Sequence, residues 1–188
     1  SLGRVLYLDA DTLVLRPLDE LYELDLRPSG LGAVAEAHDA TVRLGLPPQA
    51  AYLNSGVLLI DLQTWREQET STQMLQRIMA EPDRWHFPDQ DILAVQFSSG
   101  WTRLPPEYNI THRFFQGSNP LPLPTEDPFV VHFTGQGSKP WQTHRHHPFA
   151  DAFWSAAQTV RQAGFSVPER PVKPRRWYQR GPVAAYRN

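Results

Sequence analysis

The sequence predicts an α/β domain, with a sheet that is parallel at least in part and flanked by helices. Short, continuous apolar runs alternate with segments whose apolar residues recur at helical spacing, an order typical of such sheets. The chain has 188 residues, 40% of them hydrophobic and 20% charged. A chain of this size can bury a core without a disulfide or a metal. Because it contains no Cys, disulfides, zinc–thiolate sites and cysteine nucleophiles are excluded.

Several short apolar runs predict the strands. Buried strands are expected at residues 4–8, 31–37, 57–60 and 129–131. Residues 12–15 continue the first apolar run after a short acidic loop. Asn54-Ser55-Gly56, directly before the third strand, is typical of a turn. Residues 38–52 and 101–128 predict loops, and no run is as long as the roughly 20 apolar residues of a membrane-spanning helix.

Four segments predict helices. A short one begins near Pro17, with acidic residues in its first turn. Residues 64–80 form an amphipathic pattern that stops before Pro82. Another helix begins at Asp89, which can cap it. The last spans residues 150–163 and is closed by Gly164.

Charge divides the chain into a body and a tail. Residues 1–160 carry 11 Lys and Arg against 19 Asp and Glu, whereas residues 161–188 carry seven against one. We therefore expect a domain over residues 1–165 and a basic, aromatic, proline-rich tail over residues 166–188. The first residue is Ser1, and an apolar run is already under way at Val5. We expect that the chain begins inside a fold, with an upstream part missing.

Asp9 and Asp11 are the first candidates for chemistry. Two carboxylates at i and i+2 after a strand point to the same side and can share a divalent cation; the plain alternative is a polar turn. The segment around them resembles both the first motif of haloacid-dehalogenase-type phosphatases and the DxD motif of nucleotide-sugar glycosyltransferases. The phosphatase motif requires an acidic pair downstream of a lysine. Lys139 is followed only by Asp151 and Glu169, and this order disfavours the phosphatase.

Two further polar segments flank predicted elements. The amide of Asn54, beside Ser55, can address sugar hydroxyls through a donor and an acceptor, although the same residues are ordinary in turns. Asp89, Gln90 and Asp91 open a helix, where acids also serve as caps. As a functional site they would form a polar wall that faces a sugar ring.

The last candidates follow the strand at residues 129–131. His132 would add a nitrogen ligand to an oxygen-rich site, which suits Mn²⁺ better than Mg²⁺; a packed histidine is the alternative. Flexible glycines such as Gly135 bring backbone N–H groups close to phosphate, and Lys139 adds a positive charge.

Together these segments resemble retaining glycosyltransferases of family 8, a group that includes glycogenin and bacterial lipopolysaccharide galactosyl- and glucosyltransferases. The four matching segments occur in the family's order and are residues 5–11, 52–61, 88–93 and 132–141. The resemblance implies a GT-A-type, Rossmann-like nucleotide-sugar transferase fold with a mixed sheet. It also implies that the family's N-terminal part, with most uridine contacts, is missing from this chain.

The resemblance assigns roles to individual residues. Asp9, Asp11 and His132 would hold Mn²⁺, with Mg²⁺ as a possible substitute, against the diphosphate of a UDP-sugar. The residues implied to bind the donor are Asn54, Ser55, Asp89, Gln90, Gly135 and Lys139. Asp89 and Gln90 would also be catalytic, with Gln90 near the anomeric carbon. Since no strong nucleophile is evident, attack from the face that UDP leaves would give retention.

The expected partners follow from the same resemblance. The donor would be a UDP-sugar that supplies glucose or galactose, and the acceptor a glycan, a lipid-linked saccharide or a protein. The basic tail favours peripheral contact with an anionic membrane, and the acidic body disfavours nucleic acid. We expect a cytoplasmic protein that can associate with the membrane surface. A catalytically silent module that keeps the metal and nucleotide-sugar site remains the alternative function.

Overall fold

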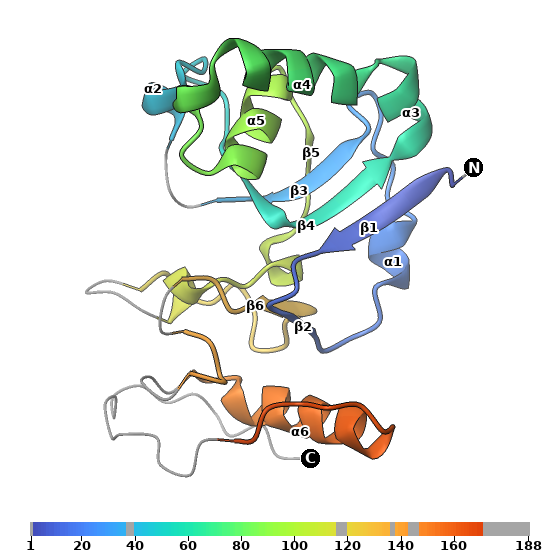
Figure 1. The fold of residues 1–188 in the computed structure, drawn as a ribbon, viewed down its shortest axis with the longest axis vertical. Coiled ribbons are helices and arrows are strands. Elements are labelled where there is room, and N and C mark those ends of the chain that lie inside the picture. The colour runs from blue at the N-terminus through green and yellow to red at the C-terminus, as the bar shows by residue number, and fades with distance from the viewer. Residues whose placement is uncertain (1, 37–39, 116–119, 136–137, 143–146, 171–188) are drawn as a thin grey trace.

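The fold of the chain is described by a computed structural model (Figure 1). It covers residues 2–36, 40–115, 120–135, 138–142 and 147–170. Most of the predicted basic tail, residues 171–188, lies outside this description.

The main sheet has four strands in the order β1-β4-β3-β5. Its strands are β1 (Arg4–Leu8), β3 (Leu31–Ala35), β4 (Leu53–Asp61) and β5 (Thr102–Arg103). The central strand β4 runs antiparallel to both β1 and β3, whereas β3 and β5 are parallel. The predicted mixed sheet is therefore confirmed.

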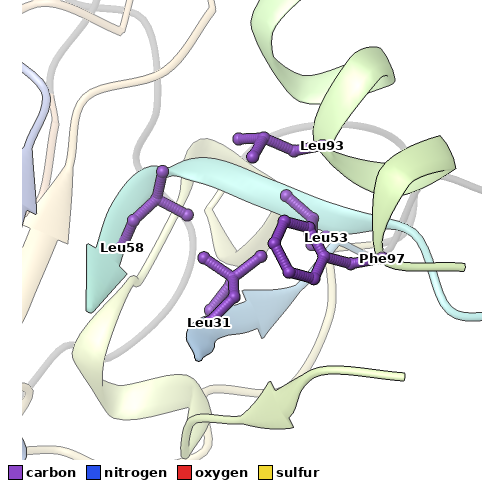
Figure 2. Packing of buried hydrophobic residues seen from close by; sticks show 6 residues of the cluster. Leu31, Leu53, Leu58, Leu93 and Phe97 are labelled. Carbon is purple, nitrogen blue, oxygen red and sulfur yellow. The ribbon is translucent and has the colours of Figure 1, made fainter. Parts of the chain in front are cut away.

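Helices cover the main sheet through an apolar core (Figures 1 and 2). They are α3 (Leu62–Glu67), α4 (Thr70–Ala80) and α5 (Pro88–Gln96). Leu31 of β3 and Leu53 and Leu58 of β4 pack with Leu93 and Phe97, at the end of α5. This packing fixes α5 on β4, so that the first turn of α5 lies beside the first half of that strand.

A second, two-stranded sheet joins distant parts of the sequence. It pairs β2 (Thr12–Val14) antiparallel with β6 (Val130–His132), and Thr12 lies opposite His132. Ile110 adds an isolated parallel bridge to Val131. Because Asp11 directly precedes β2, this register brings the acidic loop to the end of β6.

The remaining elements are short, except for the last helix. They are α1 (Asp19–Tyr22), α2 (Thr41–Leu44), η1 (Pro82–Arg84), η2 (Pro106–Tyr108), η3 (His112–Phe114) and α6 (Ala150–Gln162). Aromatic contacts attach α6 to the second sheet: the rings of Phe153 and Phe133 meet edge to face at 5.7 Å. Phe153 also lies 5.2 Å from the ring of Trp141.

The predicted turn at Asn54-Ser55-Gly56 is wrong, since these residues belong to β4. The strand is nevertheless irregular at these residues. On β3 the neighbours Ala33 and Val34 pair with Leu58 and Asn54, so β4 carries three extra residues between these pairs. Such a bulge aims side chains away from the regular pleat and is common beside active sites. We call residues 54–57 the β4 bulge.

Other expectations on the elements need smaller corrections. The helix predicted over residues 64–80 is two helices, since Glu69 adopts a left-handed backbone (φ 51°) between α3 and α4. The loop over residues 38–52 contains α2, which ends at Gly45 (φ 63°). Strand β1 is only partly buried and Tyr7 is exposed, because in the described sheet β1 pairs on one side alone.

Candidate active site

The acidic loop between β1 and β2 holds Asp9 and Asp11 in a compact turn. The backbone N–H of Asp9 donates to Gly56 O at 2.9 Å, and the Thr12 hydroxyl donates to Asp9 O at 2.8 Å. Tyr7 donates its hydroxyl hydrogen to the carboxylate of Asp9 at 2.8 Å. This hydrogen bond raises the pKa of Tyr7 to about 12, so Tyr7 remains a donor at physiological pH.

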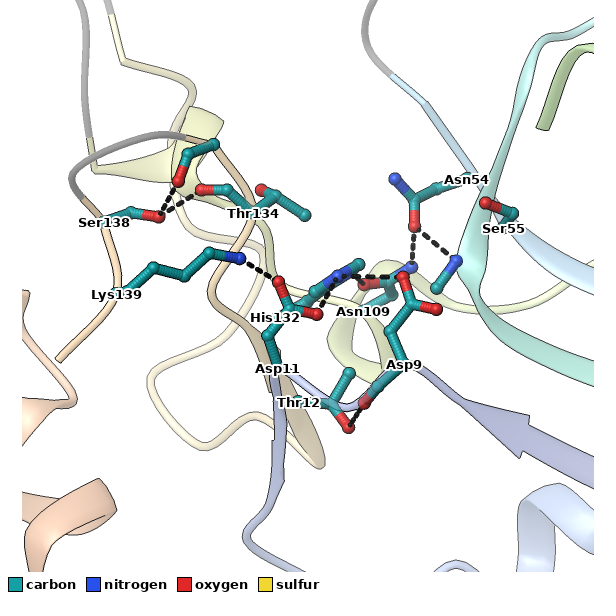
Figure 3. A network of polar contacts seen from close by, with 12 residues as sticks. Asp9, Asp11, Thr12, Asn54, Ser55, Asn109, His132, Thr134, Ser138 and Lys139 are labelled. Atoms are coloured by element: carbon teal, nitrogen blue, oxygen red, sulfur yellow. Dashed lines mark hydrogen bonds and ion pairs between the residues drawn. The ribbon is translucent and has the colours of Figure 1, made fainter. Parts of the chain in front are cut away.

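His132 completes a cluster of three potential metal ligands (Figure 3). Its Nε2 lies 3.3 Å from Asp9 Oδ2 and 3.1 Å from Asp11 Oδ1. One ligand atom from each residue fits within 4.8 Å, and no second group of this kind occurs among the described residues. The hydrogen bonds from His132 and Tyr7 lower the pKa of Asp9 despite its partial burial.

This donor set fits a divalent cation. Nε2 and the two carboxylates are all electron-pair donors, so without a cation their close approach requires a shared proton. A cation can take the place of that proton. Two carboxylates with one imidazole form a mixed oxygen and nitrogen set that suits Mn²⁺ and tolerates Mg²⁺.

Gly56 in the β4 bulge makes room for the histidine. A Cβ atom built on Gly56 would overlap Cε1 and Nδ1 of the His132 ring. The ring therefore lies directly against the backbone of β4. This steric role was not predicted from the sequence, although a glycine inside a strand is a known sign of close approach by another group.

The loop after β6 brings Lys139 to the acidic cluster. Its ammonium group forms an ion pair with Asp11 Oδ2, the carboxylate oxygen that does not face His132. Gly135 has a left-handed backbone (φ 81°), and the Ser138 hydroxyl donates to Gly135 O at 3.0 Å. Residues 136 and 137 lie outside the described part of the chain. Lys139 and the cluster are thus neighbours, as the diphosphate-binding prediction requires.

His112 lies on the other side of this loop. The hydroxyl oxygen of Thr134 is 2.6 Å from His112 Nδ1 and accepts a hydrogen bond from the His112 backbone N–H at 3.2 Å. Burial lowers the pKa of His112, which favours its neutral form. These contacts tie the start of the Gly135 loop to η3.

The β4 bulge is also joined to the first turn of α5. The Ser55 hydroxyl donates to Asp89 Oδ2 at 2.6 Å, and the Ser55 backbone N–H donates to Gln90 Oε1 at 3.1 Å. The structure therefore brings together Ser55, Asp89 and Gln90, although 34 and 35 residues of chain separate them. Their roles toward a donor sugar remain predictions.

The amides of Asn54 and Asn109 extend from this bulge to the histidine (Figure 3). Asn54 Nδ2 donates to Glu36 Oε2 at 2.8 Å, and Asn54 Oδ1 accepts from Asn109 Nδ2 at 2.7 Å. Asn109 Oδ1 lies 3.1 Å from His132 Nδ1. Asn109 was not predicted as a site residue, because residues 101–128 show no regular pattern and a single Asn in a loop carries no signal.

Asp91, the second acid at the start of α5, turns away from Asp89 and Gln90 into the protein. Its side chain is fully buried and accepts two 2.8 Å hydrogen bonds from Arg43 and one of 2.6 Å from Tyr52. Backbone N–H groups of residues 86 and 87 also donate to it. Burial alone would raise the pKa of Asp91, but these donors outweigh burial and lower it to about 2. Burial and Asp91 raise the pKa of Tyr52. The prediction that Asp91 belongs to the polar wall is therefore wrong, and Asp91 is instead an anchor of α5.

Comparison with known proteins identifies the family. A sequence profile described as glycosyl transferase family 8 matches residues 1–145. The chain belongs to glycosyl transferase family 8. The resemblance carried by the four sequence segments is thereby confirmed.

Curated relatives in family 8 are about 30% identical to the chain. General stress protein A of Bacillus subtilis (strain 168) is 31% identical over 167 residues, which cover 82% of this chain and 58% of the relative. Lipopolysaccharide 1,2-glucosyltransferase of Escherichia coli (strain K12) is 30% identical over 159 residues, which cover 79% of this chain and 47% of the relative. The chain thus spans about half the length of these relatives.

Solved structures confirm the predicted GT-A-type fold. An active-site mutant of LgtC has a TM-score of 0.70 at 26% identity, covering 84% of this chain and 62% of that chain. Galactosyltransferase LgtC in complex with donor and acceptor sugar analogs has a TM-score of 0.65 at 28% identity, and the match covers 89% of this chain and 64% of that chain.

Within the described part of this family 8 chain, no helix combines the length and apolar character needed to cross a membrane.

Proposed function

We propose that this family 8 chain is the catalytic part of a retaining glycosyltransferase. It transfers glucose or galactose from a UDP-sugar to a saccharide, lipid-linked or protein acceptor. The observation that carries the proposal is the cluster of Asp9, Asp11 and His132 beside the wall formed by Ser55, Asp89 and Gln90. The LgtC complex with donor and acceptor sugar analogs supports this kind of reaction for the fold.

Asp9, Asp11 and His132 would hold Mn²⁺, or Mg²⁺ in its place. The bound ion supplies positive charge, which stabilises the negative charge that develops on the departing diphosphate. Lys139 supplies a second positive charge from the same side when it exchanges Asp11 for a phosphate oxygen. The left-handed backbone of Gly135 lets the main chain approach a phosphate without a clash from a side chain.

Ser55 orients two groups toward the proposed sugar site. Its hydroxyl holds the carboxylate of Asp89, and its backbone N–H holds the side-chain oxygen of Gln90. A carboxamide is a weak nucleophile, so Gln90 favours stabilisation of an oxocarbenium-like sugar over formation of a covalent adduct. The acceptor would then attack from the face that UDP leaves, which retains the anomeric configuration.

Hydrolysis of UDP-glucose and UDP-galactose by the purified full-length protein, with Mn²⁺ or with a chelator, tests the proposal. We expect hydrolysis that requires the cation and is lost in Asp11→Asn. Asp83→Asn, which changes an exposed carboxylate in η1, is the matched control. Binding of Mn²⁺ and UDP without any hydrolysis would instead identify a catalytically silent binding module. Unchanged metal and UDP affinities in Asp11→Asn would refute the proposed site itself.

A further inference from the structure

Asn109 lies between the metal-ligand histidine and the β4 bulge without belonging to either. It directly follows η2, and only 1% of its surface is exposed. Its two side-chain polar atoms contact different partners: one lies 3.1 Å from His132 Nδ1 and the other 2.7 Å from the Asn54 amide. The side chain therefore connects two residues of the proposed site.

A backbone group decides which way the Asn54 amide points. The N–H of Gly56 lies 2.9 Å from one polar atom of the Asn54 side chain. Because a backbone N–H can only donate, that atom has to be the oxygen. The nitrogen of Asn54 then faces the carboxylate of Glu36, which can accept its hydrogen. Both ends of the amide agree with this orientation.

The orientation of Asn54 in turn decides that of Asn109. Since Asn54 presents its oxygen, the Asn109 atom facing it has to be the nitrogen, and the oxygen of Asn109 faces His132. An oxygen of this kind only accepts, so the proton of the contact belongs to His132 Nδ1. When a cation takes the place of the shared proton, the ring is neutral and its electron pair is left on Nε2, the atom nearest the two carboxylates.

We propose that Asn109, held by Asn54, is a positioning residue that keeps the proton of His132 on Nδ1 and reserves Nε2 for the cation. This inference rests on the proposed metal site. Partners of this kind behind a ligating histidine orient the ring and increase the basicity of the ligand. The backbone of Gly56 supports the ring from one face, and Asn109 adds the directional contact that packing alone does not supply.

Two measurements on the full chain test the inference. In ¹⁵N-histidine-labelled, metal-free protein we expect an exchange-protected Nδ1–H signal of His132, assigned by its loss in His132→Gln. This signal disappears in Asn109→Leu, which has a similar size and no acceptor. It is retained in Asn109→Asp, which keeps an acceptor toward His132 but loses the hydrogen bond to Asn54. Mn²⁺ affinity, measured by calorimetry, falls about 10- to 100-fold in Asn109→Leu, and Asn109→Asp recovers part of that loss. Tyr108→Phe, a change at the adjacent buried residue, should match the unmodified chain in both measurements.

Several outcomes separate this inference from the proposed function. An unprotonated Nδ1 in the unmodified chain overturns the inference, even if Asn109→Leu cannot be folded. It is also overturned if Asn109→Leu binds Mn²⁺ as tightly as the unmodified chain. If the two Asn109 variants lose equal affinity, the role is merely structural and the inference fails. Failure of the unmodified chain to bind Mn²⁺ refutes the proposed metal site, while the Nδ1–H signal still decides the role of Asn109.

Discussion

The contact between Gly56 and His132 makes a single methyl group a sensitive probe of the site. The backbone of Gly56 lies outside the left-handed region, so alanine is conformationally allowed there, and the cost of Gly56→Ala comes from overlap with the His132 ring. We expect Gly56→Ala to displace the ring and weaken Mn²⁺ binding by about 10- to 100-fold, as measured by calorimetry. Gly3→Ala is the control, because a Cβ there meets no atom within 4 Å. Equal Mn²⁺ affinities in the two variants would show that the ring is not held against β4.

At the proposed metal site, Lys139 would compete with a cation for the carboxylate of Asp11 before a donor binds. Its ion pair with Asp11 has to open if that oxygen is to serve a metal or if the ammonium is to reach a phosphate. In Lys139→Met we therefore expect Mn²⁺ affinity without nucleotide to rise several-fold, whereas UDP affinity in the presence of Mn²⁺ falls. Calorimetry of each ligand separates these opposite effects. The same change at the other lysine, Lys173→Met, is the control. If the Mn²⁺ affinity and the UDP affinity of Lys139→Met changed in the same direction, the competition would be contradicted.

At the scale of residues, the sequence predicts those parts of the site that a short motif carries. The structure brings together Asp9, Asp11 and His132, as predicted. This prediction was possible because an acidic pair after a strand and a histidine at a strand end belong to the segments that resemble one family. Asn109 and Glu36 were beyond prediction. The contact of Asn109 depends on how the segment after η2 packs against the β4 bulge, and that of Glu36 depends on the pairing of β3 with β4. Neither residue type has a distinctive spacing.

Among the elements, α5 depends on the buried carboxylate of Asp91. Its pKa falls from an ordinary value of 3.8 to about 2 in the folded protein. The stabilisation that ionised Asp91 gives to the folded protein is fully present above the ordinary pKa and is lost as pH falls through about 2. The shift corresponds to about 2 kcal/mol of folding stability. We expect the free energy of unfolding, from urea titrations, to decrease between about pH 4 and pH 2, and to decrease less in Asp91→Asn.

The matched control for this pH dependence is Asp83→Asn, an exposed carboxylate in the preceding turn. Asp83→Asn should keep the full decrease, because Asp83 makes none of the buried contacts that Asp91 makes. If Asp91→Asn and Asp83→Asn show the same pH profile, the buried carboxylate does not carry the acid sensitivity of the fold.

The elements were predictable where local pattern and tertiary structure agree. The apolar run before Asp61 and the helix near Asp89 are such cases, and both form. The predicted cap is wrong, because α5 begins at Pro88 and Asp89 makes no capping hydrogen bond. The β4 bulge could not be predicted, because Asn-Ser-Gly has the local chemistry of a turn. Pairing of Asn54 with β3 and of Val57 with β1 keeps this segment in the sheet instead. The break between α3 and α4 at Glu69 could not be predicted either, because no Gly or Pro marks it in the sequence.

At the scale of the whole molecule, the separation of charge predicts behaviour at a membrane surface. The acidic body would be repelled by anionic lipid, whereas the basic tail, with Trp177 and Tyr178, would be attracted to it. Each Lys or Arg near an anionic surface contributes about 1 kcal/mol, and this attraction decreases as salt is added. The tail can therefore bind the surface in spite of the net −2 of the chain, because its basic residues can approach the lipid while the acidic body stays farther away.

Flotation with anionic liposomes tests this consequence of the charge separation. We expect the full chain to float with vesicles that contain phosphatidylserine at low salt, and to be released at high salt. A chain that ends at residue 167 should stay in solution under both conditions, since its remaining charge is acidic. Vesicles of phosphatidylcholine alone control for contact by the aromatic residues without charge attraction. Equal partitioning of the full and the shortened chain would show that the tail does not direct this protein to a membrane, and any membrane acceptor would then have to be recognised by the domain itself.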